Sequence, residues 1–410
     1  MEILAAPDRG GFLAADVPFP IEFSPLPRRL GPTFTHERMH FQVQTQALKA
    51  AIDAVSHASA PSAAAPILEN ILLSVQFNKI VLTANNLEMA VEYVLEKNVK
   101  ILKEGAFTVS SRFLTSYIAL AKDDSVEIEL IGHGTLLFKT ASGETKFKGL
   151  PADEFPVIPS IRKEQSFRLS GKDLKAAFEK TLFSTAQGTI RPTLAGVYVA
   201  LAEKEVTFAS TDSFRLSEFV LPHGANVAKP VSIIIPTRTA QELSKLVPED
   251  ATAEIFISDK QLLAVVNDVR VFSRLLSGHF PDYRAFFPKS HRTRGVVLRS
   301  EMIHALKQVS LISRENNYNT RLQFAAETGM TLDTGDTEVG AGKVRVKATV
   351  EGENATIGIN STYLIDALNV IRENYVSVDF ETPLSPIMVR ASDAKETAGA
   401  YRHIIMPLKI

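Results

Sequence analysis

Residues 170–186, SGKDLKAAFEKTLFSTA, decide the fold, because the same kind of unit recurs along the whole chain. Ser170 is a favourable helix N-cap, and Asp173 stands three residues later in the position of a capping box. The segment therefore predicts a short amphipathic helix. Its apolar face is formed by Leu174, Ala177, Phe178 and Leu182.

Six copies of this unit follow one another, and each has an apolar strand, a capping residue and a helix. The caps are 65, 60, 67, 63 and 60 residues apart, and they are Thr45, Ser110, Ser170, Thr237, Ser300 and Asn360. The strands before them are predicted at residues 40–43, 106–109, 167–169, 231–235, 295–298 and 355–359. Such a regular period indicates an internal repeat with room for one helix and several strands per copy.

The six predicted helices differ in charge from the rest of the chain. They span residues 45–58, 110–122, 171–186, 237–247, 300–314 and 360–374, and together they carry a net charge of +4. Since the whole chain has a net charge of −1, the remainder carries −5. The sequence thus predicts a mildly positive set of helices in a mildly acidic protein, although scatter of surface charge would give the same pattern.

The composition is that of an ordinary globular protein. With 410 residues and 45% hydrophobic residues, the chain has room for two to four domains with ample core. It has no cysteine, so disulfides, thiolate metal ligands and cysteine nucleophiles are excluded. No apolar run is long enough for a transmembrane helix, and no secretory signal is evident. We expect a cytoplasmic protein.

The repeats pair into three domains. We predict a leader at 1–38, which holds six prolines and is expected to be extended or disordered, followed by domains at 39–159, 160–289 and 290–410. Met39 directly precedes the first repeat, so translation could begin there. Residues 149–156 and 278–288 are expected to be linkers rich in turns. The fold class is α+β, with helices on one face of mostly antiparallel sheet.

Motifs for catalysis and metal binding are missing from the sequence. There is no phosphate-binding loop, no dinucleotide fingerprint and no HExxH motif, and the nine histidines have no metal-ligand spacing. We expect no cofactor and no metal. A hydrolase with a site near Asp212, where Thr211 or Ser213 would be the nucleophile, is the alternative, but no partner base is evident. A repeated scaffold favours a binding role over catalysis.

The last ten residues are unusually apolar for a chain terminus. Residues 401–405 have a β-like pattern, and Met406, Pro407, Leu408, Lys409 and Ile410 follow. Terminal residues are ordinarily polar and frayed. We therefore expect this tail either to complete a sheet or to line a groove.

Seven short segments together resemble one known family. The chain is similar to the bacterial sliding clamp, the beta subunit of DNA polymerase III, over residues 39–410, and the segments occur in the family's order. They are residues 66–73 (PILENILL), 86–89 (NLEM), 150–156 (LPADEFP), 191–194 (RPTL), 211–216 (TDSFRL), 280–284 (FPDYR) and 405–408 (IMPL).

The resemblance implies a non-enzymatic protein that forms a ring around duplex DNA as a head-to-tail homodimer. Each subunit would give three similarly folded domains, and two helices from each domain would line the hole. Positive side chains there would attract phosphates without reading the bases. The residues implied to face DNA are Lys49, Arg112, Lys172, Lys175, Arg238, Lys245 and Lys307, with Arg191 on a nearby loop.

The resemblance also implies a hydrophobic groove between the second and third domains. It would bind short peptides of the DNA polymerase III catalytic subunit, the clamp loader, other polymerases and repair proteins. The implied groove residues are Leu194, Thr211, Ser213, Arg215, Leu216, Pro281, Phe286, Tyr363, Pro386, Ile404, Met406, Pro407 and Leu408.

The resemblance also implies a ring interface, which would join Phe147 of one subunit to Leu311 and Ile312 of the next.

Four positions depart from the family's pattern. Phe214 stands where the family usually has His, so a polar contact is lost there. Lys409 replaces a common Arg, and Asn85 with Asn86 replaces the usual Thr-Asp. The first two changes bear on the preference among peptides, and they leave the predicted site in place.

Overall fold

A computed structural model gives the structure of most of the chain beyond the leader. The described residues are 39–60, 65–132, 134–158, 160–161, 165–188, 191–222, 230–258, 260–393 and 400–409. The predicted leader at 1–38 lies outside them. Among the described residues, no helix is long and apolar enough to cross a membrane.

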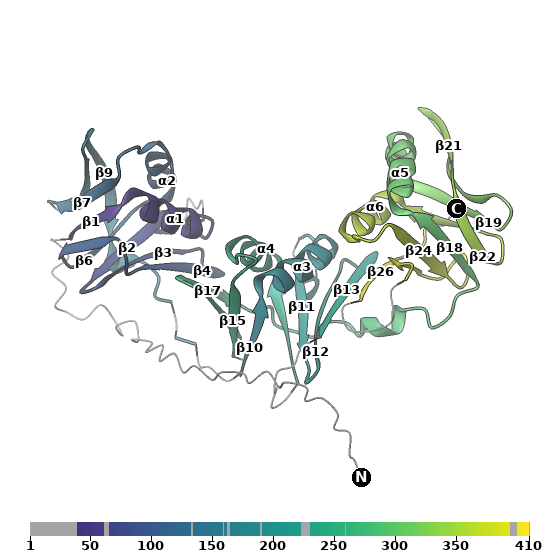
Figure 1. Ribbon diagram of the computed structural model, residues 1–410, viewed down its shortest axis with the longest axis horizontal. Coiled ribbons are helices and arrows are strands. Elements are labelled where there is room, and N and C mark those ends of the chain that lie inside the picture. Colours follow the sequence, from purple (N-terminus) through teal and green to yellow (C-terminus); the bar gives the residue numbers. More distant parts are fainter. Residues whose placement is uncertain are drawn as a thin grey trace, which may run out of the picture. The chain divides into compact units, whose positions relative to one another are not determined.

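The first domain consists of two helices that pack against each other and against antiparallel strands (Figure 1). Its helices are α1 (Thr45–Ser56) and α2 (Ser111–Leu120). Its strands are β1 (His40–Gln44), β2 (Asn70–Gln76), β3 (Lys79–Asn85), β4 (Met89–Leu95), β5 (Val99–Lys103), β6 (Gly105–Ser110), β7 (Ser125–Ile131), β8 (Thr135–Thr140) and β9 (Gly143–Pro151).

The second domain repeats this plan. Its helices are α3 (Gly171–Thr181) and α4 (Thr237–Leu246), which pack against each other. Its strands are β10 (Gln165–Ser170), β11 (Gly196–Leu201), β12 (Glu205–Thr211), β13 (Arg215–Pro222), β14 (Val231–Pro236), β15 (Thr252–Ile257), β16 (Gln261–Val266) and β17 (Val269–Arg274).

The third domain contains the last two copies of the repeat. Its helices are α5 (Arg299–Ser313) and α6 (Ser361–Val370), which also form a packed pair. Its strands are β18 (Thr293–Leu298), β19 (Asn319–Ala325), β20 (Gly329–Thr337), β21 (Gly340–Val346), β22 (Ala348–Gly352), β23 (Ala355–Asn360), β24 (Tyr375–Phe380), β25 (Ile387–Ala391) and β26 (Tyr401–Ile405).

The six strand–helix units predicted from the sequence are all present, because each helix directly follows a strand. The strand pairings between named strands are antiparallel throughout the described residues, as expected for the α+β class. The second predicted linker forms a 3-10 turn at Tyr283–Phe286. The first was wrong in part, since Gly149–Pro151 extend β9 and pair with β6. Gly149 makes this possible, since a Cβ there would lie 1.9 Å from the Thr108 carbonyl oxygen.

The predicted caps were correct at three of the six helices. Ser110, Ser170 and Asn360 occupy the N-cap position, and the last two accept a hydrogen bond from the helix backbone. Thr45 and Thr237 are the first helical residues instead, and Ser300 lies inside α5. The local sequence pattern gave the wrong N-cap residues because two of these hydroxyls make tertiary contacts instead of capping their helices. Thr45 Oγ1 donates to the Asp123 carbonyl at 2.5 Å, and Thr237 Oγ1 donates to that of Ala195 at 2.9 Å.

The apolar face predicted for α3 is buried except at Leu182, which lies beyond the last residue of the helix and is half-buried. Leu48, Ile52 and Val55 of α1 and Leu174, Ala177 and Phe178 of α3 have almost no exposed surface. Leu311 of α5 is 80% exposed. Met302, Ala305 and Val309 fill the core with Leu306 instead, so the buried stripe of α5 lies on a different face from Leu311.

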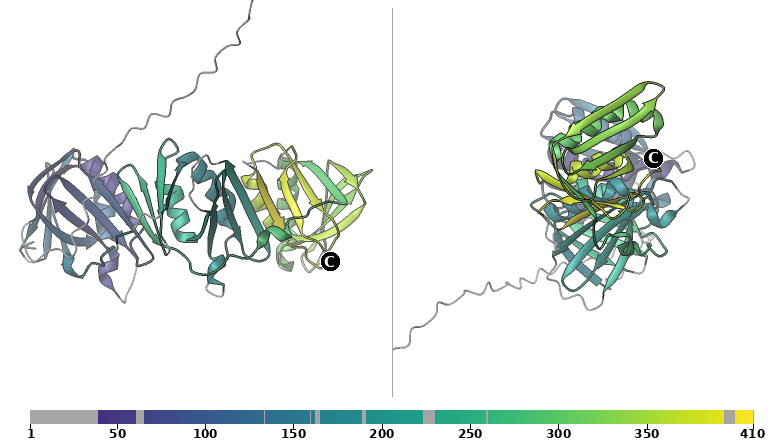
Figure 2. Two further views of the ribbon diagram at one scale, coloured as in Figure 1. Left: turned by 90° about the horizontal axis from the view of Figure 1, so that it is seen from below. Right: turned by 90° about the vertical axis from the view of Figure 1, so that its right-hand side faces the viewer.

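The sheets continue across the junctions between domains. Strand β17 of the second domain pairs with β4 of the first, and β26 of the third pairs with β13 of the second. Figure 2 shows these strands side by side in the view from below. The results are a 13-stranded sheet and a 9-stranded sheet, each shared by two domains.

The C-terminal strand β26 carries a fully buried histidine. His403 Nδ1 lies 2.9 Å from Ser217 Oγ on the paired strand and 3.3 Å from the Tyr401 hydroxyl oxygen. Burial, assisted by the positive charge of Arg215, lowers the pKa of His403 to about 3. The imidazole is therefore neutral in the folded protein near pH 7.

The N-cap of α3 offers a test of the local energetics. We expect Ser170→Ala to lower the free energy of unfolding by about 1 kcal/mol, because the Asp173 amide loses its acceptor at 3.1 Å. Urea unfolding measures this change. Ser110→Ala is the matched control, since Ser110 occupies the same position without a side-chain cap bond. Equal losses in both variants would contradict the assignment.

The buried histidine predicts a pH dependence of stability. Between pH 3 and the unfolded pKa of about 6.5, the unfolded chain binds a proton that folded His403 does not, so stability falls as the pH falls. We expect a loss of about 2 kcal/mol between pH 7 and pH 5 through this group. Urea unfolding at both pH values should show a smaller loss in His403→Gln, while the exposed control His57→Gln should keep the wild-type loss. Equal losses in wild type and His403→Gln would refute the prediction.

Candidate functional site

An apolar cavity of about 380 Å³ lies where the second and third domains join. Four segments surround it: residues 191–194, the turn before β13, the linker that precedes the third domain, and the end of the chain. Its lining residues are Arg191, Thr193, Leu194, Thr211, Ser213, Arg215, Leu216, Pro281, Tyr283, Phe286, Ile404 and Met406. We call this cavity the groove.

The turn before β13 is fixed by its own side chains. The carboxylate of Asp212 accepts hydrogen bonds from the backbone amides of Phe214 and Arg215, both at 2.9 Å. Ser213 has a φ of 80°, and its amide donates to Thr211 Oγ1. Asp212 therefore shapes the turn as an Asx motif. The alternative of a hydrolase at Asp212 is not supported, because its carboxylate and the Thr211 hydroxyl are held by backbone groups of the turn.

Arg215 connects the groove to the third domain. Its guanidinium lies 3.1 Å from Asp212 Oδ2 and 2.5 Å from Asp366 Oδ2 on α6. It also stacks on the ring of Tyr363, 4.4 Å from the ring centre. Burial raises the pKa of the Tyr363 phenol, so this ring stays neutral. A charge held by two carboxylates and a ring has little freedom, so Arg215 gives the groove a rigid polar wall.

The C-terminal tail both completes a sheet and lines the groove, so both roles expected from its sequence are present. Residues Tyr401–Ile405 form β26 between β13 and β25. Beyond the strand, the Met406 amide donates to the Phe214 carbonyl and the Leu408 amide to the Gly358 carbonyl, both at 2.8 Å. These bonds direct the Met406 side chain into the groove lining.

The linker at residues 278–288 forms another wall of the groove. Tyr283 is buried, and its hydroxyl donates to Glu218 Oε2 at 2.8 Å. Burial, together with the charge of Glu218, raises the pKa of the Tyr283 phenol. Phe286 of the lining is 51% exposed, and Phe214, which lies between the lining residues Ser213 and Arg215 in the chain, is 59% exposed. Exposed aromatic side chains at an apolar cavity are typical of a surface that binds another molecule.

Nine of the thirteen predicted groove residues line the cavity, and four do not. Tyr363 contacts Arg215 but does not line the cavity, and Pro386, Pro407 and Leu408 are half-buried outside the lining. Sequence reasoning missed Thr193 and Tyr283, although both belong to quoted motifs. Arg191, which we predicted to face DNA, lines the groove and donates to Ser213 Oγ at 2.7 Å.

The basic residues predicted on the helices are mostly exposed. Lys175 is half-buried, while the other six point their charge to solvent: Lys49, Arg112, Lys172, Arg238, Lys245 and Lys307. Two have protein partners as well, because Lys245 Nζ lies 3.0 Å from Glu242 Oε1, and Arg238 donates to the His57 carbonyl at 3.3 Å. Exposure leaves most of these cations available to a polyanion.

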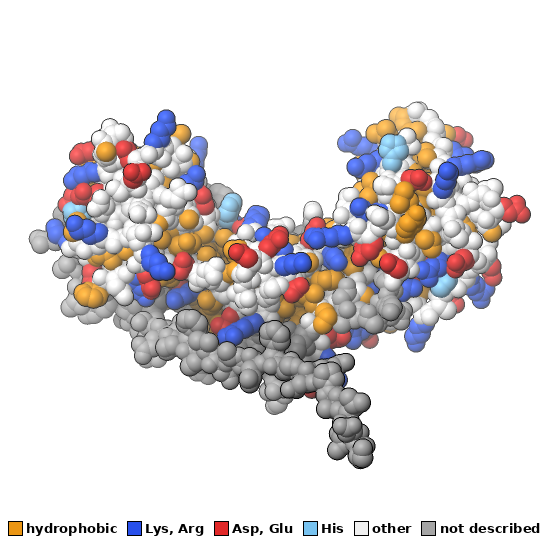
Figure 3. Space-filling model, in the orientation of Figure 1, with side chains coloured by type: hydrophobic (Ala, Val, Ile, Leu, Met, Phe, Trp, Pro, Cys, Tyr) orange, Lys and Arg blue, Asp and Glu red, His pale blue; other side chains and the backbone are white. Residues whose placement is uncertain are grey.

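Charges of both signs lie over the helices. Within their observed bounds, the six helices carry nine Lys or Arg and six Asp or Glu residues, a net charge of +3. The predicted +4 included Lys122, which lies beyond the end of α2. Figure 3 shows blue and red side chains intermixed over α3 and α4. Such a surface attracts phosphates weakly.

The three predicted interface residues lie in different surroundings. Phe147 is half-buried and packs edge-on against Tyr117 and Phe138, with ring centres 5.3 and 5.1 Å away. Leu311 is exposed, and Ile312 is half-buried. The exposed leucine on α5 is available for contact with another chain.

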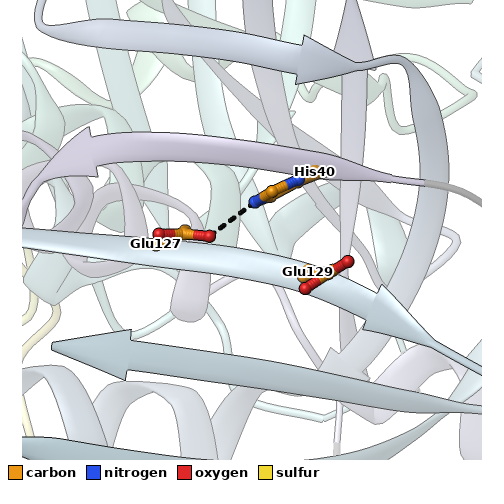
Figure 4. A group of neighbouring side chains, drawn as sticks. All are labelled: His40, Glu127 and Glu129. Carbon is orange, nitrogen blue, oxygen red and sulfur yellow. Dashed lines mark hydrogen bonds and ion pairs between the residues drawn. The ribbon is translucent and has the colours of Figure 1, made fainter.

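His40, Glu127 and Glu129 form a cluster that the sequence did not reveal, because their strands β1 and β7 are far apart in the chain (Figure 4). Their ligand atoms lie within 4.8 Å of one another. His40 Nε2 is 2.6 Å from Glu127 Oε1, and Glu129 is 3.4 Å from Lys139 Nζ. These contacts account for the arrangement of all three side chains.

Family models match the chain in three consecutive pieces. The N-terminal, central and C-terminal domains of the DNA polymerase III beta subunit match residues 39–159, 168–282 and 284–409. The beta sliding clamp of Staphylococcus epidermidis is 28% identical over 360 residues, which are 86% of this chain and 94% of that protein. The beta sliding clamp of Staphylococcus aureus is 28% identical over 365 residues, which are 87% of this chain and 95% of that protein.

Solved structures agree in fold. The DNA polymerase sliding clamp of Bacillus subtilis superposes with a TM-score of 0.87 at 24% identity, covering 91% of this chain and all of that chain. A sliding clamp of Pseudomonas aeruginosa bound to griselimycin gives a TM-score of 0.84 at 24% identity with the same coverage. With three domain models matched in order over nearly the whole described chain, the protein belongs to the DNA polymerase III beta subunit family.

Proposed function

We propose that the protein is a DNA sliding clamp, a processivity factor that encircles duplex DNA and tethers a replicative polymerase. One observation carries this proposal: the three beta-subunit domain models match in chain order from residue 39 to residue 409. The protein acts without catalysis, and the satisfied carboxylate of Asp212 agrees with this role. It is expected in the cytoplasm, where DNA is replicated.

The ring is a head-to-tail homodimer in this proposal. Phe147 of one subunit meets Leu311 and Ile312 of the next, and the domain boundaries are 39–159, 160–289 and 290–410. The 80% exposure of Leu311 supports an interface, because a large aliphatic side chain gains free energy when it leaves water.

DNA passes the helices without specific contacts. Sequence-independent binding needs positive charge near the phosphates, and the small net charge of the helices gives weak attraction. Weak attraction permits sliding, while closure of the ring prevents dissociation. The DNA-facing residues in this proposal are Lys49, Arg112, Lys172, Lys175, Arg238, Lys245 and Lys307, while Arg191 belongs to the groove.

The groove is the docking site for partner proteins. Its apolar lining and the fixed guanidinium of Arg215 suit a short peptide with apolar side chains. The expected partners are the DNA polymerase III catalytic subunit, the clamp loader, and other polymerases and repair proteins with such peptides. Phe214 adds an exposed aromatic ring to the turn that borders the groove.

The proposed ring leads to a prediction of the protein's mass in solution and of its retention on circular DNA. We expect light scattering to give about twice the 44.9 kDa chain mass, and the loaded protein to stay on closed circular DNA but leave after linearisation. Leu311→Asp should weaken the dimer at least about tenfold, because it places a charge in the interface. Leu384→Asp is the control, since Leu384 is 77% exposed elsewhere on the third domain. A monomer at all micromolar concentrations, or equal retention on linear and circular DNA, would refute the ring.

The groove predicts the effect of removing one aromatic side chain. We expect Phe286→Ala to raise the Kd of a labelled clamp-binding peptide from the same organism's polymerase III catalytic subunit about tenfold. Fluorescence anisotropy measures this change. Phe77→Ala is the control, because Phe77 is 88% exposed on the first domain. An unchanged Kd in Phe286→Ala would place the peptide elsewhere.

A further inference from the structure

The two junctions between domains are built alike. At the first, Asn86 Oδ1 accepts the amides of Glu88 and Met89, and the Glu88 carbonyl accepts the Arg274 amide at 3.0 Å. At the second, Asp212 Oδ1 accepts the amides of Phe214 and Arg215, and the Phe214 carbonyl accepts the Met406 amide. The residues in the centre of the two turns have similar positive φ values, 73° at Leu87 and 80° at Ser213.

Both junctions also contain a buried glutamate opposite an arginine of the next domain. Glu92 on β4 pairs in register with Arg270 on β17, and Glu218 on β13 pairs with Arg402 on β26. The two glutamates are 2% and 1% exposed. They occupy equivalent positions, because each stands four residues after the turn residue whose carbonyl accepts the cross-domain amide.

The second pair also contacts the linker, through Tyr283 and Phe287. Glu92 Oε2 lies 3.7 Å from Arg270 Nη1. Glu218 Oε1 accepts from Arg402 Nε at 3.0 Å, and its Oε2 accepts the Tyr283 hydroxyl at 2.8 Å. The Arg402 guanidinium lies 4.1 Å from the ring centre of Phe287 in the linker. Glu218 thus connects three segments: β13, the linker and the tail strand.

Two of these segments form walls of the groove. Tyr283 lies in the lining between Pro281 and Phe286, and Arg402 stands two residues before Ile404 on the tail strand. We propose that Glu218 is a positioning residue for peptide binding, which holds the linker wall through Tyr283 and the tail wall through Arg402. This inference rests on the proposed function of the groove.

The physical argument is one of preorganisation. A buried carboxylate is costly unless its charge is paired and its oxygens accept hydrogen bonds, and Glu218 has both. Replacing it with Gln removes the charge that holds Arg402 but leaves an oxygen that can accept only one of the two contacts. The two walls of the groove are then more mobile in the free protein, so peptide binding carries the additional free-energy cost of ordering them.

The test compares matched variants of the full chain at the two junctions. Each of Glu92→Gln and Glu218→Gln removes a buried charge from the pair at its junction. We measure the Kd of the labelled polymerase III peptide by anisotropy and the free energy of unfolding by urea. We expect both variants to lose stability, and only Glu218→Gln to bind the peptide about tenfold more weakly. Glu92→Gln should stay within about twofold of wild type, since it lies at the other junction.

Tyr283→Phe provides a second variant that removes only the hydroxyl. We expect it to weaken binding, and we expect its effect to be less than additive with that of Glu218→Gln, because both break the same contact. If Glu218→Gln does not fold, Tyr283→Phe alone decides, and a Kd within about twofold of wild type overturns the inference.

Two results keep the inference separate from the function on which it rests. If the wild-type protein does not bind the peptide, the proposed function of the groove fails. If the wild type binds and Glu218→Gln binds equally well, or both glutamate variants lose the same affinity, Glu218 is only a stabilising residue and the positioning role is overturned.

Discussion

Backbone hydrogen bonds between strands of neighbouring domains are the constraint on which the rest of the structure depends. Strand β17 pairs with β4, and β26 pairs with β13, so each sheet continues from one domain into the next. A strand pairing fixes both the register and the direction of the chains it joins. The groove exists because this register places Ile404 and Met406 beside the turn that precedes β13.

The helices could be predicted from the sequence because their apolar residues recur at helical spacing and each follows an apolar strand. Leu48, Leu174 and Leu364 are all buried, as their spacing indicates. The exact start of a helix was harder to predict, since Thr45 uses its hydroxyl for a contact with residue 123 instead of a cap. Leu182 shows a related limit, because it continues the apolar spacing of α3 but lies beyond the last helical residue and is half-buried.

Most of the groove could be predicted from motifs that a family shares, and the missing parts depend on contacts between distant residues. Glu218 and Arg402 are 184 residues apart, so no local pattern connects them. The same holds for Arg215 and Asp366, and for His40 and Glu127. These pairs became visible only when the strand pairing brought them together. Arg191 was assigned to the DNA surface for the same reason, because its contact with Ser213 cannot be read from spacing.

The position of β26 in the chain has a consequence for synthesis. Strand β13 leaves the ribosome 184 residues before the strand that covers its edge. At about 5–20 residues per second, this edge waits roughly 10 to 40 s for its partner. An uncovered strand edge is open to pairing with other chains. A nascent chain therefore completes the groove and covers the edge of β13 in the same event, which cannot occur before translation has passed residue 406.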